Sequence, residues 1–288
     1  MTEHYLWHLG DGANYDEQNR IFAASCRNDA RMWVGTEKQF GQNFLFDLNL
    51  TGRIARSVPD IAKLPVVEVG PGPAGLTRAL LMAGAQRVIA IEKDKTTQPI
   101  LSRVIDASSG RLDVIFDDAL KVDFEKLGVK EYAICANLPY NVGTELLIGW
   151  LQKIANGAPI KSMTLMFQRE VAQRIVARVG DTQYGRLSIL TSLIADAKIL
   201  FGVPSTAFVP RPKVESAVVQ IIPNAKKIKQ IGDLSKIENV TAKLFGQRRK
   251  MIRGIMSGVD WAQFGLSGTE RAEELSPAIF VKIASVVI

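Results

Sequence analysis

The sequence predicts a Rossmann-like, doubly wound α/β fold, and three observations support this fold class. Short apolar, β-branched runs alternate with longer segments of helical periodicity, which is typical of parallel strands joined by crossover helices. The first run leads directly into a glycine-rich turn that opens a helix. The last two runs are joined by a proline-rich turn with no room for a crossover helix, so we expect the last strand to be antiparallel.

The predicted sheet is mainly parallel and has seven strands. They are expected at residues 66–69, 88–91, 112–116, 132–136, 163–167, 198–203 and 217–222. A helix is expected after each of the first five strands. Residues 204–212, which contain the prolines, are expected to turn the chain back into a final hairpin.

The domain organisation follows from where these patterns begin and end. Residues 1–36 show no strong periodicity and are expected to form an N-terminal extension whose structure the sequence does not predict. Residues 37–222 hold the predicted sheet. Further on, strand signals fade and residues 234–256 and 269–285 show helical periodicity. Residues 223–288 are therefore expected to form a small helical domain.

Composition favours a cytoplasmic globular protein. With 288 residues, of which 47% are apolar, the chain has enough material for one large domain and a smaller companion. No apolar stretch approaches the ~18 residues that a membrane span requires. The N-terminus carries Glu3 and Asp11 where a signal peptide would carry Lys or Arg, so we expect no membrane partner.

Histidine and cysteine are too scarce for several kinds of site. The only histidines, His4 and His8, lie near the N-terminus, which argues against histidine base catalysis and His-ligated zinc in the body of the protein. Cys26 and Cys135 permit neither a disulfide framework nor a four-cysteine metal site. We therefore expect no metal.

The charge distribution favours a polyanionic partner. The net charge is +7, and the isoelectric point is near 9.4. Residues 223–288 contain eleven Lys and Arg against six Asp and Glu, whereas residues 1–35 contain three Arg against five acids. The basic weight therefore lies at the C-terminal end.

The glycine-rich turn after the first strand predicts a nucleoside site. Gly70, Gly72 and Gly75 have G-x-G-x-x-G spacing, and Glu92 follows at the end of the second strand, where a carboxylate can bind ribose hydroxyls. The spacing fits a nicotinamide dinucleotide, S-adenosylmethionine, or a connection that binds nothing. Pro71 and Pro73 lack the N–H groups that cradle a pyrophosphate, which favours a cofactor without phosphates.

Polar groups also follow the third and fourth predicted strands. Asp117 and Asp118 end the third strand, where one carboxylate could recognise an adenine amine and where a solvated turn is equally common. The tetrapeptide 137–140, Asn-Leu-Pro-Tyr, follows the fourth strand. Pro139 removes a backbone donor and biases Leu138 away from helix, so nearby carbonyls can accept an amine. Tyr140 offers a face for stacking, although an ordinary strand-to-helix loop also fits.

Taken together, these motifs resemble the small-subunit ribosomal RNA adenine dimethyltransferases of the KsgA type. The resemblance runs in order through FGQNFL (40–45), EVGPGP (68–73), IEKD (91–94), DAL (118–120), NLPYN (137–141), MFQREV (166–171), YGRLS (184–188), FVPRPKV (208–214), QRRK (247–250) and RAEEL (271–275). It departs at Ala74, where the family usually has glycine, and at residues 36–39, which are less basic than usual.

The resemblance implies a Rossmann-like S-adenosylmethionine-dependent methyltransferase fold over residues 37–222 and an RNA-binding helical domain over residues 223–288. It implies transfer of two methyl groups to N6 of each of two adjacent adenosines near the 3′ end of small-subunit rRNA, within an immature small ribosomal subunit. A monomer is expected. By the same resemblance, the S-adenosyl-L-methionine site is lined by Asn43, Leu45, Gly70, Gly72, Glu92, Asp118 and Asn137.

The expected chemistry needs no base. Acceptors from Asn137 and the Leu138 carbonyl would draw the amine hydrogens aside and free the lone pair for attack on the sulfonium methyl. The flipped adenine would be held between flat groups, for which Tyr140 and Phe208 are the two candidates. RNA contacts are expected from Lys213, Arg248, Arg249, Lys250 and Arg253.

Three alternatives remain open on the sequence alone. A catalytically silent assembly or transcription factor could keep the fold without the chemistry. A large-subunit rRNA adenine methylase shares the catalytic motif, although the segments 208–214 and 271–275 favour the small-subunit enzyme. A nicotinamide dehydrogenase shares only the glycine-rich turn.

Overall fold

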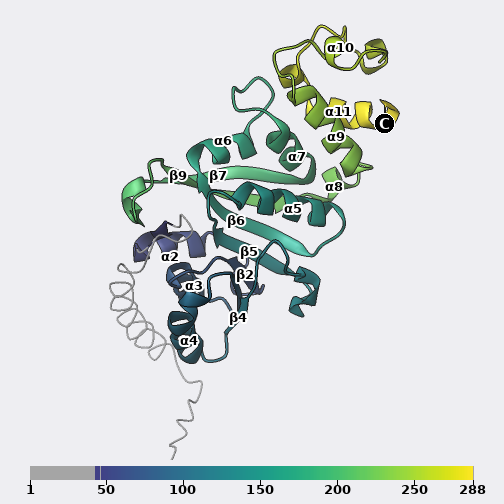
Figure 1. The fold of residues 1–288 in the computed structure, drawn as a ribbon. Helices are drawn as coiled ribbons and strands as arrows, with labels where there is room; N and C mark the ends of the chain where they lie inside the picture. The colour runs from purple at the N-terminus through teal and green to yellow at the C-terminus, as the bar shows by residue number, and fades with distance from the viewer. Residues whose placement is uncertain (1–42, 46, 288) are drawn as a thin grey trace, which may run out of the picture.

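A computed structural model of the protein describes residues 43–45 and 47–287 (Figure 1). The predicted N-terminal extension lies outside the described residues, and so do His4, His8 and Cys26. A seven-stranded sheet has the order β4-β3-β2-β5-β6-β9-β7, and β1 pairs with β8. The strands are β1 Phe44–Leu45, β2 Val66–Val69, β3 Val88–Glu92, β4 Leu112–Phe116, β5 Tyr132–Asn137, β6 Ile160–Gln168, β7 Ala195–Val203, β8 Phe208–Val209 and β9 Ser216–Pro223.

The strand directions confirm the predicted fold class. Strands β4, β3, β2, β5 and β6 pair in parallel, whereas β9 is antiparallel to both β6 and β7. The chain runs from β2 through β3 to β4 on one side and then returns to place β5 on the other side of β2. The strand order therefore reverses between β2 and β5, which is where doubly wound folds bind their ligands.

Helices cover both faces of the sheet. One apolar cluster joins the sheet to α2, α3 and α4, and the other joins it to α5, α6 and α7 and continues into the C-terminal helices. The α-helices are α2 Leu48–Arg56, α3 Gly75–Met82, α4 Gln98–Ala107, α5 Gly143–Ala155, α6 Arg169–Val176, α7 Arg186–Ile194, α8 Ala225–Ile228, α9 Leu234–Phe245, α10 Ile252–Ile255 and α11 Pro277–Val287. Within residues 43–45 and 47–287, none of the helices combines the length and apolar character needed to cross a bilayer.

The connection between β4 and β5 differs from the expected helix. It contains only a 3₁₀ turn, η2 Phe124–Leu127. The Phe124 ring stacks on Tyr132 at 6.2 Å and meets Trp150 edge-on at 6.3 Å. Because this segment buries its aromatic side chain against β5 and α5, a single turn is enough to cover that part of the sheet.

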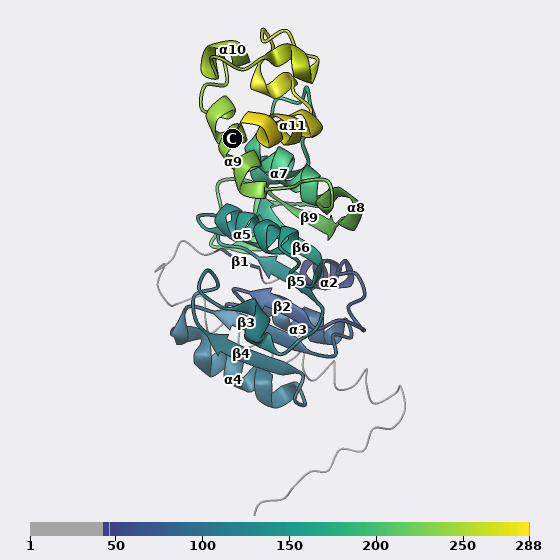
Figure 2. The same cartoon turned by 90° about the vertical axis from the view of Figure 1, so that its right-hand side faces the viewer.

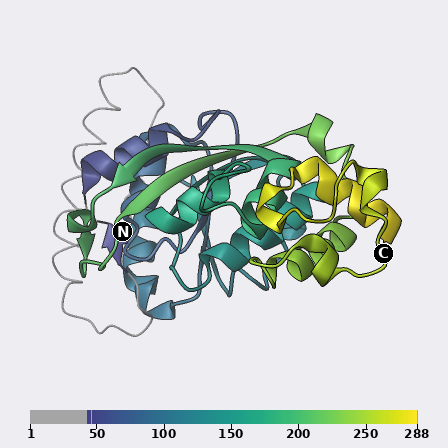
Figure 3. The same cartoon turned by 90° about the horizontal axis from the view of Figure 1, so that it is seen from above.

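Helices α9, α10 and α11 lie at the end of the molecule farthest from α4 (Figures 1 and 2). Seen from above, they lie at the opposite end from α2 (Figure 3). The predicted helix over 234–256 is broken, because α9 ends at Phe245 and a turn precedes α10. Helices α9 and α11 pack on each other and on α7, and the Tyr184 hydroxyl donates to the Leu275 carbonyl at 2.9 Å. The C-terminal helices are thereby attached to the sheet-covering layer.

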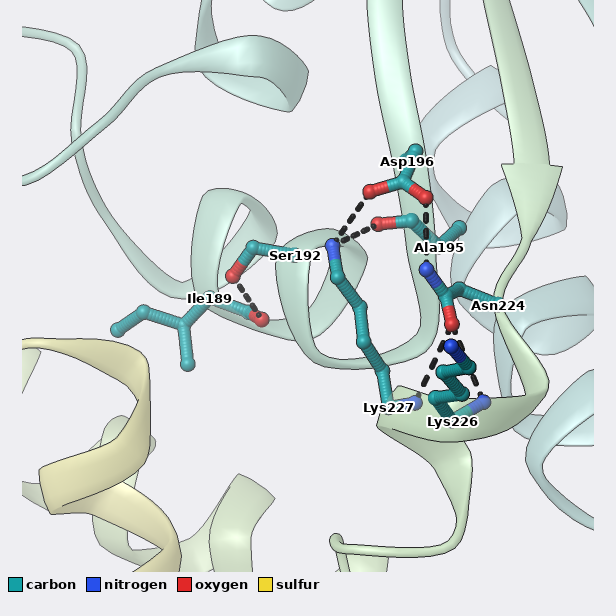
Figure 4. A network of polar contacts seen from close by, with 7 residues as sticks. All are labelled: Ile189, Ser192, Ala195, Asp196, Asn224, Lys226 and Lys227. Atoms are coloured by element: carbon teal, nitrogen blue, oxygen red, sulfur yellow. Dashed lines mark hydrogen bonds and ion pairs between the residues drawn. The ribbon is translucent and has the colours of Figure 1, made fainter.

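A polar network fixes the direction in which the chain leaves β9 (Figure 4). Asn224 accepts from the amides of Lys226 and Lys227 and so caps α8, while its amide donates to Asp196 at 2.8 Å. The Lys227 ammonium lies 2.7 Å from Asp196, and these two partners hold the pKa of Asp196 below its ordinary value. Lys227, in the basic C-terminal part of the chain, therefore joins the start of β7 to the start of α8.

Gly75 lets the first helix after the glycine-rich turn approach β1 closely. A Cβ atom at Gly75 would lie 2.7 Å from the Leu45 carbonyl oxygen, which is a backbone clash. Gly149, inside α5, has open space around its Cβ position and no positive φ angle. Only the first of these glycines is required by packing.

We expect Gly75→Ala to lower the free energy of unfolding by on the order of 1–3 kcal/mol, because β1 or α3 must shift. Gly149→Ala should raise it by up to about 1 kcal/mol, because alanine loses less backbone entropy in a helix. Urea unfolding of both variants measures the difference. Equal effects would show that the close approach at Leu45 carries no strain.

Candidate functional site

Two adjoining clefts open where the strand order reverses. The larger, of about 1110 Å³, lies at the ends of β2, β3 and β4 and the start of α5, and its polar lining residues are Glu92, Lys93, Asp94, Asp117, Asp118 and Asn141. The smaller, of about 420 Å³, is lined by Asn43, Phe44, Gly70, Gly72, Asn137, Leu138, Pro139 and Tyr140. Gly70 and Pro139 line both clefts, which therefore meet between the glycine-rich turn and the 137–140 turn.

The glycine-rich turn between β2 and α3 bends through left-handed backbone conformations. The φ angles of Gly70 and Gly72 are +72° and +50°, where a side chain is strained. Ala74 adopts a φ of +62°, which costs an alanine roughly 1–2 kcal/mol relative to a right-handed conformation. A Cβ atom at Gly72 would also lie 3.0 Å from the Phe44 ring. The turn therefore keeps the shape of a glycine loop in spite of its alanine.

Glu92 fastens this turn to the end of β3. Its carboxylate accepts the Gly72 N–H at 2.9 Å and the Asp94 N–H at 2.8 Å. The side chain is buried, and this burial raises the pKa of Glu92, whereas the Asp94 and Gly72 amides lower it. A buried carboxylate with two fixed donors lines the larger cleft, in the position predicted to bind ribose hydroxyls.

Asp118 lines the same cleft and forms an ion pair with Lys93. Its carboxylate lies 2.8 Å from the Lys93 ammonium and accepts the Leu120 N–H at 3.1 Å. The Lys93 hydrogen bond, followed by the Leu120 amide, lowers the pKa of Asp118. Lys93, a cation that lines the cleft, is thus neutralised by an acid, which makes the cleft a poor match for a pyrophosphate.

The 137–140 turn presents two acceptors to the smaller cleft. The side-chain NH2 group of Asn137 donates to the backbone carbonyl of Asn43 at 3.3 Å, which leaves the side-chain oxygen of Asn137 available. Pro139 accepts the Val142 and Gly143 amides and so starts α5. Within the described part of the chain, neither the Asn137 side-chain oxygen nor the Leu138 carbonyl accepts a hydrogen bond. The predicted amine acceptors therefore lie side by side without a donor.

Tyr140 lines the smaller cleft, whereas two other predicted site residues are buried in the core. Tyr140 is half-buried, lines the smaller cleft, and its hydroxyl lies 2.7 Å from that of Ser216. Phe208 and Leu45 are 3% and 5% exposed and face each other across the β1–β8 pair. Neither lines the two clefts described above. Their apolar side chains belong to the apolar cluster that also contains residues of α2, α3 and α4.

The predicted RNA-contacting residues divide into two groups. Lys213, Arg249, Lys250 and Arg253 are exposed and form no ion pair with any described residue. Arg248 instead lies 2.6 Å from Glu273 and donates to the Thr182 carbonyl at 2.9 Å. Arg248 therefore connects the turn after α9 to the loop at Thr182 and to the 3₁₀ helix at Glu273. Among the described residues, no group of three or more His, Cys, Asp or Glu side chains is placed to hold a metal ion.

A buried acid under the site was not predicted. Glu68, in β2, is 1% exposed, and neither carboxylate oxygen has a hydrogen-bond partner among the described residues. Burial, opposed in part by Thr77 and helped by nearby Glu92, raises the pKa of Glu68 to about 8. The sequence signal was an acid inside an apolar strand, Val-Val-Glu-Val.

We expect Glu68→Gln to remove a pH dependence of stability. Folded Glu68 keeps a proton up to about pH 8, whereas an unfolded glutamate releases it near 4.5, so wild-type stability falls as pH rises between these values. The variant should gain stability relative to wild type on going from about pH 5 to about pH 8, by on the order of a few kcal/mol. Urea unfolding at both pH values measures this. Glu145→Gln, on the exposed face of α5, is the control, and a pH-independent difference would contradict the assignment.

Comparisons with known proteins identify the family of the chain. The family model for ribosomal RNA adenine dimethylase matches residues 35–287. The ribosomal RNA small subunit methyltransferase A of Xanthobacter autotrophicus is 50% identical over 262 residues, covering 88% of this chain and 90% of that protein. A dimethyladenosine transferase from Plasmodium falciparum has a TM-score of 0.69 at 24% identity, over 83% of this chain and 95% of that one. The 23S rRNA methyltransferase ErmE has a TM-score of 0.61 at 23% identity, over 84% and 98%. These two structures show the fold, and the family match and the 50% identity show that the chain belongs to the ribosomal RNA adenine dimethylase family.

Proposed function

We propose that the chain transfers two methyl groups to N6 of each of two adjacent adenosines near the 3′ end of small-subunit rRNA, on immature small subunits in the cytoplasm. Its family makes it an rRNA adenine dimethylase that uses S-adenosyl-L-methionine. The relative at 50% identity, named for the small subunit, favours that substrate. One observation carries the site assignment: the larger cleft meets the smaller one beside two acceptors without donors.

The larger cleft fits the adenosine part of this cofactor. Glu92 is positioned to accept ribose hydroxyls, and Asp118 to accept the adenine amine. Val69, Ile91, Leu120 and Leu146 supply apolar walls. Pro71 and Pro73 remove two amides from the turn, and Lys93 is paired with Asp118. This donor set disfavours a pyrophosphate, and therefore a nicotinamide dinucleotide.

The smaller cleft would receive the target adenine. When bound, S-adenosyl-L-methionine supplies an electrophilic methyl group on a sulfonium. Asn137 and the Leu138 carbonyl would accept the two amine hydrogens and orient the nitrogen lone pair. Tyr140 would stack on the base, at a gain of roughly 1–3 kcal/mol. We assign stacking to Tyr140, because the Phe208 ring would first have to leave the core.

RNA would be held mainly outside the clefts. We propose that residues 37–222 form the catalytic domain and that residues 223–288 bind rRNA through Arg249, Lys250 and Arg253, whose charges are free of ion pairs among the described residues. Lys213 would add a contact beside the catalytic domain, and Arg248 would hold this surface in shape. We propose that the active unit is a monomer.

Two other functions are less well supported. A silent assembly factor would not need two unpaired acceptors beside a cofactor cleft. A large-subunit methylase shares the fold, since the ErmE structure is similar. An identity of 23%, however, gives no support for a shared substrate.

We expect labelled methyl groups from S-adenosyl-L-methionine to enter unmethylated small subunits and not large subunits. Asn137→Ala should lower the rate by on the order of 10²-fold, because one of two fixed amine acceptors is lost, while RNA affinity changes little. Asn156→Ala, at the exposed end of α5, is the matched control. Tight RNA binding without incorporation would instead support the silent factor.

We expect Arg249→Ala with Lys250→Ala to weaken RNA binding and to reduce its salt slope by about 2, because each residue contributes roughly one phosphate contact. The control is Lys63→Ala with Lys126→Ala, which removes the same charge from exposed residues near the amino ends of β2 and β5. Binding measured over a salt series gives both slopes. Equal slopes for the two double variants would place the RNA elsewhere.

A further inference from the structure

Ser216 is a buried hydroxyl that reaches the smaller cleft through one other side chain. It begins β9, is 0% exposed, and its hydroxyl lies 2.7 Å from the hydroxyl of Tyr140. Tyr140 lines the smaller cleft, and Ser216 does not. Any effect of Ser216 on a molecule in the cleft must therefore pass through the Tyr140 ring.

The strand that carries Ser216 is held on both sides. Ser216 is paired with Gln168 of β6 and with Val203 of β7. The preceding residue, Glu215, accepts the Arg169 N–H at 2.9 Å and forms an ion pair with the Arg169 side chain. Tyr140, by contrast, follows a proline in an irregular turn. The hydrogen bond thus links the turn of the site to a fixed point inside the sheet.

We propose that Ser216 is a positioning residue for methyl transfer, which holds the far end of the Tyr140 ring in place so that the adenine stacks with its amine toward Asn137 and Leu138. The proposal rests on the function proposed above. A hydrogen bond at the hydroxyl, the far end of the side chain, restrains the first side-chain torsion. The hydroxyl oxygen lies on the axis of the second torsion, so the bond acts on the ring plane only through the preference of the phenolic O–H to lie in that plane. The ring face remains free for the base, because the bond uses only the hydroxyl.

A purely structural role is the alternative, in which the bond merely satisfies two hydroxyls. That role predicts a loss of stability without a specific loss of turnover. Ser162 provides the matched comparison. It lies in β6, is 1% exposed, and its hydroxyl has no partner among the described residues. Ser162→Ala makes the same chemical change in the same sheet without touching Tyr140.

The test compares wild type, Ser216→Ala, Tyr140→Phe, the double variant and Ser162→Ala in methyl transfer to unmethylated small subunits. We expect Ser216→Ala and Tyr140→Phe each to lower kcat about 3- to 10-fold, the worth of one hydrogen bond. KM for subunits and the Kd for S-adenosylhomocysteine, measured by titration calorimetry, should change less than about twofold. The double variant should be no slower than the slower single variant, because both lose the same bond. Ser216→Thr should restore most of the rate.

Three other outcomes would contradict the positioning role, and the last would also contradict the proposed function. If Ser216→Ala is as active as Ser162→Ala, or if the two single losses multiply in the double variant, the positioning role is wrong and the proposed function stands. If wild type transfers no methyl group to small subunits, the proposed function and the positioning role fall together.

Discussion

The hydrogen bonds from the Gly72 and Asp94 amides to the Glu92 carboxylate hold the site together. They tie the turn after β2 to the end of β3 at a point that is buried from water. A buried carboxylate without donors would be costly, so the turn and the carboxylate stabilise each other. The Gly72 amide comes from the turn that Gly70 bends through a left-handed conformation, whereas the Asp94 amide lies two residues after Glu92 itself. The larger cleft lies beside them.

The position of β5 beside β2 places the 137–140 turn next to the glycine-rich turn. Because the strand order reverses between β2 and β5, the 137–140 turn emerges directly opposite the glycine-rich turn. β6 and β9 then extend the sheet beyond β5, and β9 places Ser216 behind Tyr140. Each wall of the smaller cleft is therefore set by a strand end, except for the segment around Asn43, which is held by the Asn137 amide and by the pairing of β1 with β8.

Much of this arrangement follows from the sequence. The strands could be predicted because buried parallel strands are continuous apolar runs, and the hairpin because a proline-rich turn leaves no room for a crossover. Glu92, Asp118 and the 137–140 turn could be predicted because polar residues directly after such strands meet at one edge of the sheet. The end of α9 at Phe245 was missed, because helical periodicity continues on both sides of it. Gly246, which caps the helix, was the local signal for that end.

The remaining features depend on long-range packing. Nothing local distinguishes a stacking aromatic from a core aromatic, and Phe208 is buried because β8 pairs with β1. Likewise Arg248 pairs with Glu273 across 25 positions of sequence, so a basic run could not reveal which of its charges are free. The raised pKa of Glu68 arises from burial and from Glu92 on the neighbouring strand, neither of which is visible in a linear pattern.

The central claim is that the meeting point of the two clefts directs methyl transfer to an adenine N6 in small-subunit rRNA. Mass spectrometry of nucleosides and fragments from small-subunit rRNA, after reaction with the purified protein, tests it most directly. The account predicts N6,N6-dimethyladenosine at two adjacent positions near the 3′ end. Methylation only at another atom of adenine, on another base, or only in large-subunit rRNA would contradict it.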